Sequence, residues 1–433
     1  MNNIFSNIKI GLVISVLLFS IKVNAQDFSL TLSDALQKAL ESNYGIVISK
    51  QDIKIAELNN TWGNAGRYPN IGFDAASTNS NELIDNTTTN RISGGIGLNW
   101  TLFNGFRTNI TKGKLEKLEK IAKGSSAVVV ENTIQDVVMS YYNILLQKER
   151  LRVLENVMQL SKDRYDYEEK KREIGSSVTY DVLLAKNVYL EDKASYLNQE
   201  VVVKNAIRNL NFLLGEQPTT TWKFTEEFNS DTKNYILGDL LDKMLANNQT
   251  LQNQYMNLLL QQDEIKYQKG ALYPSVSLSA GVDNSYSWVN TETQGKTYNE
   301  DLTPYGNVTL SYDIFNGGNR KRDIDIARIN EEITQVETEE IKHSLTNELY
   351  NEFETYNLRK VLLNVANESL QAAEMNLKIA DEKYKTGAIN SFNYRDIQLN
   401  YLNSAINQLQ SIYNLIYSNT NLTRLTGGFL NEQ

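Results

Sequence analysis

Few residues of this chain have the type and spacing that catalysis or metal binding requires. The sequence contains no Cys, which excludes disulfides, thiolate nucleophiles and thiolate metal sites. Its single histidine, His343, falls in a long polar segment and lacks the neighbouring ligands that a metal site needs. The motifs H-E-x-x-H and G-x-S-x-G and the P-loop are absent, and the Gly-rich run 94–97 falls in a predicted strand without a following helix. Carboxylate pairs such as Glu168 and Glu169 lie on charged helix faces. We therefore expect no enzymatic activity, no cofactor and no bound metal.

The amino terminus has the pattern of a secretory signal peptide. An apolar run over 10–21 precedes a small-x-small site at 23–25, which predicts a signal peptide over 1–25 and a mature chain that starts at Gln26. A membrane anchor is the alternative, but the run is shorter than the roughly 18 residues that a spanning helix needs. Removal of the segment takes two lysines with it, so the formal net charge changes from −9 to −11. An acidic chain disfavours nucleic acid as a partner and suits a solvated surface or a cation-tolerant channel.

The two halves of the chain repeat the same blocks in the same order. The matching segments are 32–43 with 237–248, 98–105 with 310–317, and the Leu-x-x-Leu-x-Gly motifs that end at Gly215 and Gly427. Three ordered matches indicate a tandem duplication, with a first repeat over 26–231 and a second over 232–433.

Each repeat shows the same order of predicted elements. In the first repeat, helices over about 32–43 and 45–66 precede Pro69, because proline disfavours the helical conformation of the residue before it. Two strands joined by a polar loop follow, and then two long helices. The predicted strands cover about 70–79, 92–102, 275–288 and 304–315, the loops about 80–91 and 287–302, and the long helices about 106–170, 177–214, 319–385 and 391–425. The four prolines fall at predicted junctions: Pro69, Pro218, Pro274 and Pro304.

The predicted strands alternate apolar and polar residues with period two. Segments of about ten residues with one apolar face are typical of transmembrane strands, and Trp100, Trp288 and Tyr312 lie near strand ends, as interfacial aromatic residues do. A soluble sheet with one wet face is the alternative. After residue 25 no window approaches 18 consecutive apolar residues, so we expect no transmembrane helix, and only a closed β-barrel could cross a membrane.

Four strands are too few to close a barrel, so several copies must contribute strands. Two copies give eight strands, and an eight-stranded barrel is filled by its own side chains. Three copies give twelve strands and leave a pore.

The long helices carry heptads. Apolar residues recur every seven positions in sets such as Val130, Val137, Ile144, Leu151, Met158 and Tyr165, and Leu349, Tyr356, Leu363, Leu370, Leu377 and Tyr384. Sustained heptads predict left-handed coiled-coil packing. A helix of about 65 residues spans roughly 97 Å, several membrane thicknesses, so the helices must project from the membrane. A free-standing trimeric coiled-coil stalk that conducts nothing is the alternative interpretation.

The whole arrangement resembles the TolC family of outer-membrane efflux proteins over essentially the entire mature chain. The motifs that carry the resemblance are Tyr-Pro before the odd strands, Phe-Asn-Gly after the even strands, and Leu-x-x-Leu-x-Gly at the end of each repeat. The resemblance implies a mainly α-helical fold with a β-barrel portion, in which a homotrimer forms a twelve-stranded barrel in outer-membrane lipid and a twelve-helix coiled-coil α-barrel across the periplasm. It also implies an exit duct for an inner-membrane pump and a periplasmic adaptor, as in tripartite efflux or type I secretion. The cargo (drug, metal ion or protein) stays open.

The same resemblance suggests roles at the two turns between the long helices. In similar proteins the Gly-initiated turns contact the adaptor, which makes Gly175, Ser176, Gly387 and Ala388 candidates for that contact. A glycine at a helix end can also take the left-handed conformation that reverses the chain.

Gate residues are implied at the same turns. An Asp six residues after the first glycine belongs to a closed-state latch in relatives, and Asp181 occupies that place. A Tyr three residues before the second glycine partners it, which matches Tyr384, and Asp396 is the best match to an acid that rings the constriction. Three copies of one Asp around an axis repel each other unless partners or cations hold them. The pattern departs from the family at Ile389, where an Arg is expected, and the second turn holds about three extra residues before its Asp.

Overall fold

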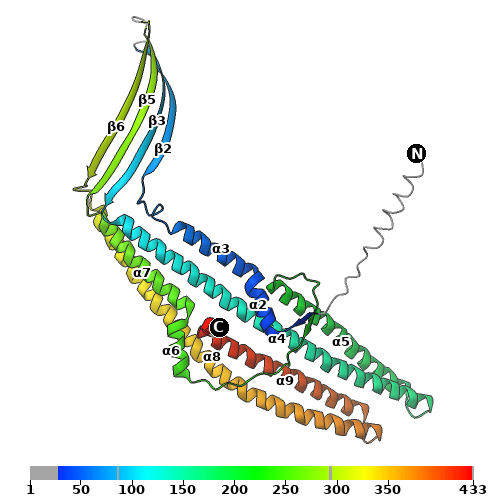
Figure 1. Ribbon diagram of the computed structural model, residues 1–433. Coiled ribbons are helices and arrows are strands. Elements are labelled where there is room, and N and C mark those ends of the chain that lie inside the picture. Colours follow the sequence, from blue (N-terminus) through cyan, green and yellow to red (C-terminus); the bar gives the residue numbers. More distant parts are fainter. Residues whose placement is uncertain (1–27, 85–86, 292–294, 432–433) are drawn as a thin grey trace, which may run out of the picture. The chain divides into compact units, whose positions relative to one another are not determined.

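The computed structural model describes residues 28–84, 87–291 and 295–431, and the predicted signal peptide lies outside them. This part of the chain is mainly α-helical and contains one four-stranded and one two-stranded sheet, as Figure 1 shows. The helices are α2 (Leu32–Ser42), α3 (Tyr44–Asn59), α4 (Arg107–Glu173), α5 (Thr179–Leu213), α6 (Leu237–Asn247), α7 (Gln249–Gly270), α8 (Asn319–Lys385), α9 (Ser391–Leu425) and α10 (Gly428–Asn431); the strands are β1 (Phe28–Leu30), β2 (Asn70–Glu82), β3 (Thr87–Asn104), β4 (Trp222–Phe224), β5 (Ser275–Thr291) and β6 (Gly295–Ser311). The fold class predicted from the sequence is confirmed.

None of the described helices combines the length and the apolar character that crossing a membrane requires.

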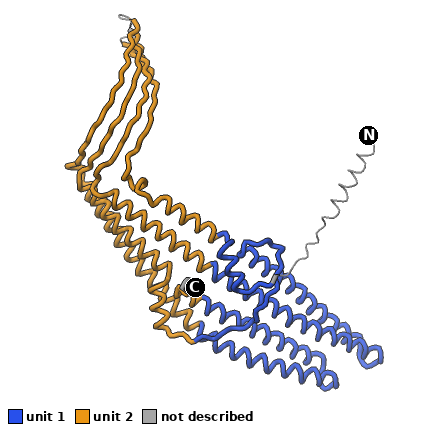
Figure 2. The backbone as a smooth tube through the Cα atoms, in the orientation of Figure 1, with its two compact units in different colours: residues 1–44, 133–233, 356–420 blue, residues 45–132, 234–355, 421–433 orange. Residues whose placement is uncertain are grey.

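The chain divides into two compact units that do not coincide with the two repeats (Figure 2). One unit comprises 1–44, 133–233 and 356–420, and the other comprises 45–132, 234–355 and 421–433. Each unit draws segments from both repeats, because the 67-residue helices α4 and α8 are long enough to contribute to both.

The four-stranded sheet is antiparallel throughout and has the order β2-β3-β5-β6. Apolar residues pair with apolar residues across it, since Phe73 lies opposite Ile96, Ile96 opposite Val282, and Leu278 opposite Val308. Residues that pair directly share a face of the sheet, so the alternation yields one continuous apolar face. That face is solvent-exposed in the single chain: Phe73 is 71% and Val308 69% exposed.

The strands are longer than the sequence predicted. Residues assigned to polar loops are paired, as with Ser80 opposite Thr89 in β2 and β3, because ladder hydrogen bonds between backbones need no apolar side chain. The fourth strand starts at Gly295 and ends at Ser311, so Pro304 lies inside β6 and not at its beginning. β6 is an edge strand, where a residue without an N–H group is tolerated.

Helix α3 ends earlier than predicted. It stops at Asn59, ten residues before Pro69, because the following segment forms turns in which the Asn64 side chain donates to the carbonyl oxygen of Asn59 at 3.0 Å. Asn and Gly favour turns, so the helix ends in the segment that contains them, before the chain reaches the proline. The four long helices begin and end within three residues of the predicted positions.

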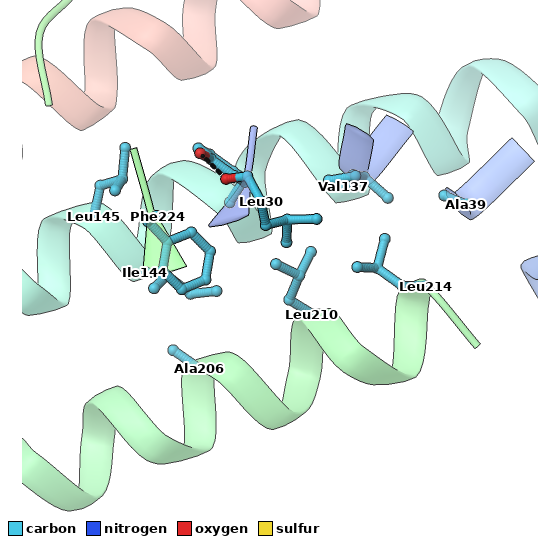
Figure 3. Packing of buried hydrophobic residues seen from close by; sticks show 11 residues of the cluster. Leu30, Ala39, Val137, Ile144, Leu145, Ala206, Leu210, Leu214 and Phe224 are labelled. Atoms are coloured by element: carbon cyan, nitrogen blue, oxygen red, sulfur yellow. Dashed lines mark hydrogen bonds between the residues drawn. The ribbon is translucent and has the colours of Figure 1, made fainter. Parts of the chain in front are cut away.

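The core of the first unit joins α2, α4 and α5 to the small parallel sheet β1-β4. Figure 3 shows Leu30, Val137, Ile144 and Leu210 pointing toward one another. Val137 and Ile144 are two of the predicted heptad positions, and both are fully buried. The core also satisfies its polar groups, because the hydroxyl of buried Tyr141 donates to the carbonyl oxygen of Leu30 at 2.9 Å.

Candidate functional site

The two turns between the long helices share one geometry. α4 ends at Glu173 and α5 begins at Thr179, while α8 ends at Lys385 and α9 begins at Ser391. Both helices end in the same way, with a glycine in the left-handed region and a backbone hydrogen bond from the next residue that reaches five residues back. At the first turn, Gly175 has a φ of 78° and the Ser176 N–H donates to the carbonyl oxygen of Lys171 at 2.8 Å. At the second, Gly387 has a φ of 77° and the Ala388 N–H donates to the carbonyl oxygen of Lys383 at 2.8 Å.

The equal length of the turns corrects one expectation. Five residues separate the helices in both turns, so the second turn holds no insertion, and the counterpart of Asp181 is Asn393. Asp396 lies almost one helical turn beyond that position and is exposed, whereas Asp181 is half-buried in the first turn of α5. The start of α9 is fixed by Asn390, whose side-chain oxygen accepts from the Asn393 N–H at 2.9 Å.

Tyr384 links α8 to α4. It is 7% exposed, and its hydroxyl donates to Oε1 of Glu168 at 2.5 Å. Its ring stacks on Tyr394 of α9, with 4.8 Å between centroids and planes 6° apart, and meets Tyr167 edge-on at 5.9 Å. Within the single chain the Tyr384 hydroxyl therefore bonds to Glu168.

Glu168 is a buried carboxylate held by several donors. It also accepts from the Ser177 hydroxyl at 2.7 Å and lies 3.7 Å from Nζ of Lys171. Burial opposes its ionisation, but the hydrogen bonds from Tyr384 and Ser177 and the charge of Lys171 outweigh burial and lower the pKa of Glu168. Burial, together with the bond to Glu168, raises the pKa of Tyr384, so this hydroxyl keeps its proton and acts as the donor.

A second link joins α5 to α9. Arg395 donates two hydrogen bonds of 2.8 Å to the two oxygens of Asp192, and both side chains are largely buried. This fork geometry fixes the pair in orientation as well as distance. Tyr394, which carries the ring stack, donates to Oδ1 of Asp381 on α8 at 3.1 Å. Together these contacts connect the four long helices near their turns.

A cavity of about 410 Å³ lies among these residues, lined by Leu160, Asp163, Arg164, Asp166, Tyr167, Lys170, Asp381, Tyr384, Lys385 and Tyr394. Its walls combine apolar and polar surface and carry both charges. The described residues contain no group of three or more His, Asp or Glu side chains that could hold a metal ion. Hydrogen bonds and ion pairs of this kind can hold helices together or release them.

The sequence names Tyr384 as a candidate but not the residues that contact it. The expectation that Glu168 lies on a charged helix face is wrong, because it is 4% exposed, and no motif marks Asp192, Tyr394 or Arg395. The charged residues among them can be recognised in the sequence because they lie on the side of a helix that the heptads bury. Arg164, which is 3% exposed, is another example.

The sequence matches a known family along most of its length. A family model described as outer membrane efflux protein matches residues 35–216 and 240–428. The chain belongs to this family. The predicted relationship to TolC-type proteins is thereby confirmed, and membership of the outer membrane efflux protein family assigns the chain to the outer membrane.

Curated relatives of this outer membrane efflux protein are distant in sequence. Cation efflux system protein CusC of Escherichia coli O157:H7 is 22% identical over 307 residues, which cover 70% of this chain and 66% of CusC. The probable efflux pump outer membrane protein TtgC of Pseudomonas putida is 19% identical over 300 residues, which cover 69% of this chain and 61% of TtgC. In these alignments the chain spans slightly less than two thirds of either relative.

Solved structures share the fold over nearly the whole chain. A crystal structure of CusC superposes with a TM-score of 0.74 at 17% identity and covers 94% of this chain and 96% of CusC. The outer membrane channel CmeC of Campylobacter jejuni gives a TM-score of 0.75 at 16% identity, with 92% and 85% covered. The open state of the Neisseria gonorrhoeae channel MtrE gives 0.72 at 14% identity, with 92% and 88% covered. This outer membrane efflux protein therefore has the fold of those channels.

Proposed function

We propose that this member of the outer membrane efflux family is the exit duct of a tripartite efflux or type I secretion system. It would conduct substrates passively from an inner-membrane pump, through a periplasmic adaptor, across the outer membrane. The observation that carries the proposal is the sheet β2-β3-β5-β6, which has one exposed apolar face and ends in two strands that pair with one neighbour each within the described chain.

The sheet is suited to closure by further copies of the chain. Its strands alternate in direction, so β6 of one copy and β2 of the next run antiparallel and can continue the ladder. Three copies supply twelve strands, which is enough for a barrel with an open interior, whereas two copies supply eight and fill their own interior. A closed ring also removes the edges, which otherwise invite aggregation.

The contacts near the turns support a gate at the periplasmic end. The pairs Tyr384–Glu168 and Arg395–Asp192 hold neighbouring helices together, and breaking them would let the helices separate. Asp181 and Asp396 are the candidates for acids that face their symmetry copies, where like charges favour opening or a bound cation. The exposed turns at Gly175, Ser176, Gly387 and Ala388 are the candidate surface for the adaptor.

The test is the mass and conductance of the mature protein purified from outer membranes in detergent. We expect three chains per particle by light scattering after subtraction of the detergent, and ion conductance in planar bilayers. Three chains without conductance would favour the non-conducting coiled-coil stalk. One or two chains per particle, or a protein found only in the soluble periplasm, would contradict the duct.

A further inference from the structure

The junction between the β-strands and the long helices, all within one compact unit, carries a feature that conduction does not require. Phe106 follows Gly105 at the start of α4, and it is the one described non-glycine residue with a positive φ, 66°. L-residues rarely adopt this left-handed conformation, because it brings Cβ too close to the following carbonyl oxygen. The Phe106 ring meets the rings of Phe103 and Tyr273 edge-on, with 5.2 and 6.0 Å between centroids, yet Phe106 stays 57% exposed.

The second repeat shows that the turn itself does not need phenylalanine. The counterparts of Gly105 and Phe106 are Gly317 and Gly318, with φ values of 68° and 78°. Glycine takes this conformation without strain. The first repeat therefore keeps a strained, exposed aromatic ring at a position where glycine would build the same turn, which points to a role for the ring outside the chain.

Phe106 borders a cavity of about 360 Å³, within the size range of small-molecule sites. The walls are Arg67, Trp100, Thr101, Leu102, Phe103, Asn104, Phe106, Thr108 and Asn109, and none of them is acidic. Trp100 and Leu102 belong to the apolar face of β3, so the cavity lies where that face ends. Arg67 is exposed, with its guanidinium 4.6 Å from the centre of the Trp62 ring.

Cations and aromatic rings recur around this junction. Arg107 lies over the ring of Tyr267 at 4.7 Å, and Arg320 lies over the ring of Tyr312 at 5.6 Å. The first turns of α4 and α8 carry no acid, although acids are favoured at helix N-termini, and the first turn of α8 continues from Arg320 into Lys321 and Arg322. Asp313 offsets part of this charge, at 4.0 Å from Arg320, and the exposed Lys321 and Arg322 supply further cations that suit an anionic surface.

We propose that the cavity bordered by Phe106 and Arg67 binds the headgroup of an anionic glycerophospholipid. Arg67 pairs with the phosphodiester, Asn104, Thr108 and Asn109 offer polar contacts to the headgroup, and the acyl chains continue along the apolar face beside Trp100 and Leu102. Amphipathic aromatic rings at this depth suit the boundary between headgroups and acyl chains. The helical portion is periplasmic, so this end of the sheet meets the leaflet that is built of phospholipid. The proposal needs the outer-membrane location and not the duct function.

The experiment is native mass spectrometry of the full-length mature protein in detergent, titrated with phosphatidylglycerol and, separately, with lipid A. We expect bound phosphatidylglycerol on the wild type and about fivefold weaker binding for Arg67→Gln, the loss that one cation causes at an anionic surface. Arg91→Gln, an exposed arginine toward the other end of β3, is the matched control and should bind as the wild type does.

Phe106→Gly separates the proposed role from a structural one. Because glycine relieves the left-handed strain, the variant should keep or raise the thermal unfolding midpoint while it loses phosphatidylglycerol. Unchanged binding in both Arg67→Gln and Phe106→Gly would overturn the proposal. So would a lowered midpoint or a dissociated oligomer in Phe106→Gly, which would assign the ring to packing or to contact between copies, and so would Arg67-dependent binding of lipid A alone.

Discussion

Replacing Tyr384 by phenylalanine removes one hydroxyl and leaves the ring in place. The stack on Tyr394 and the edge contact with Tyr167 involve the ring, so the variant keeps them and removes the contacts of the hydroxyl, of which the 2.5 Å hydrogen bond to Glu168 joins α8 to α4. A hydrogen bond to a charged group contributes about 1.5–3 kcal/mol. If the bond exists only while α4 and α8 are held together, its loss shifts the equilibrium toward separated helices about 10- to 150-fold for each chain that carries the variant, since about 1.4 kcal/mol is a factor of ten.

The assay is the open probability of single channels in planar bilayers, with vancomycin sensitivity of the producing cells as the second readout. Tyr384→Phe should raise both. Tyr180→Phe is the control, because Tyr180 is 63% exposed at the first turn. If Tyr384→Phe and Tyr180→Phe behave alike, and a double-mutant cycle of Tyr384→Phe with Glu168→Gln shows no coupling, the reasoning is refuted.

The pH dependence of the Tyr384–Glu168 hydrogen bond follows from the direction in which the pKa of Glu168 is shifted. The pKa of Glu168 is lowered below its ordinary value of 4.5 in the folded chain, because hydrogen bonds and Lys171 outweigh burial. The stability that it contributes is then present above about pH 4.5 and is lost as the pH falls through the lower, folded value. The wild type should keep its closed state down to about pH 4.5, whereas Tyr384→Phe should lose closure at a higher pH than the wild type.

Two further substitutions test buried charges. Arg395→Ala leaves Asp192 buried without its partner, so we expect a loss of about 3–5 kcal/mol in the free energy of unfolding, measured by thermal denaturation. Arg395→Leu combined with Asp192→Leu should recover part of this loss. Equal losses in the single and the double variant would contradict the pairing. Burial raises the pKa of Glu131 to about 7, and the charge of Arg424 opposes this shift. The stability that the protonated side chain contributes is therefore present below about pH 4.5 and is lost as the pH rises through about 7. Glu131→Gln should therefore raise the unfolding midpoint at pH 8 more than at pH 5, and a shift that does not depend on pH would rule out this ionisation.

The parts of the fold that can be predicted from the sequence are those determined by residues close together in the chain. Heptads place Val137 and Ile144 in the core, and the alternation of β3 places Ile96 on the apolar face opposite Val282. Glycine at a helix end fixes the left-handed turn at Gly175. Each of these depends on residues within a few positions, so the pattern carries the information.

The contacts between helices depend on partners far apart in sequence, and no local pattern identifies them. Glu168 and Tyr384 are 216 residues apart, and Asp192 and Arg395 are 203 apart. A charge on the side of a helix that the heptads bury can be recognised in the sequence, but the distant residue that pairs with it cannot. The strand ends were missed for a different reason, because polar residues that continue a ladder carry no apolar signal.

The duplication makes the two turns alike in backbone and different in chemistry. At the spacing of 212 residues that relates Gly175 to Gly387, the counterpart of Tyr384 is Arg172, and the counterpart of Glu168 is Ala380. The first repeat therefore has no second copy of the tyrosine–carboxylate link, and each chain contributes one such bond. A trimer has six such turns, two in each chain. Three of them would carry this bond, and they would alternate around the ring with three turns that lack it. If these bonds close the proposed gate, the free energy that keeps it closed should scale with three copies of a single contact. Removing it in one chain of a mixed trimer should change the open probability by the cube root of the factor seen when all three chains carry Tyr384→Phe, if the three contacts act independently.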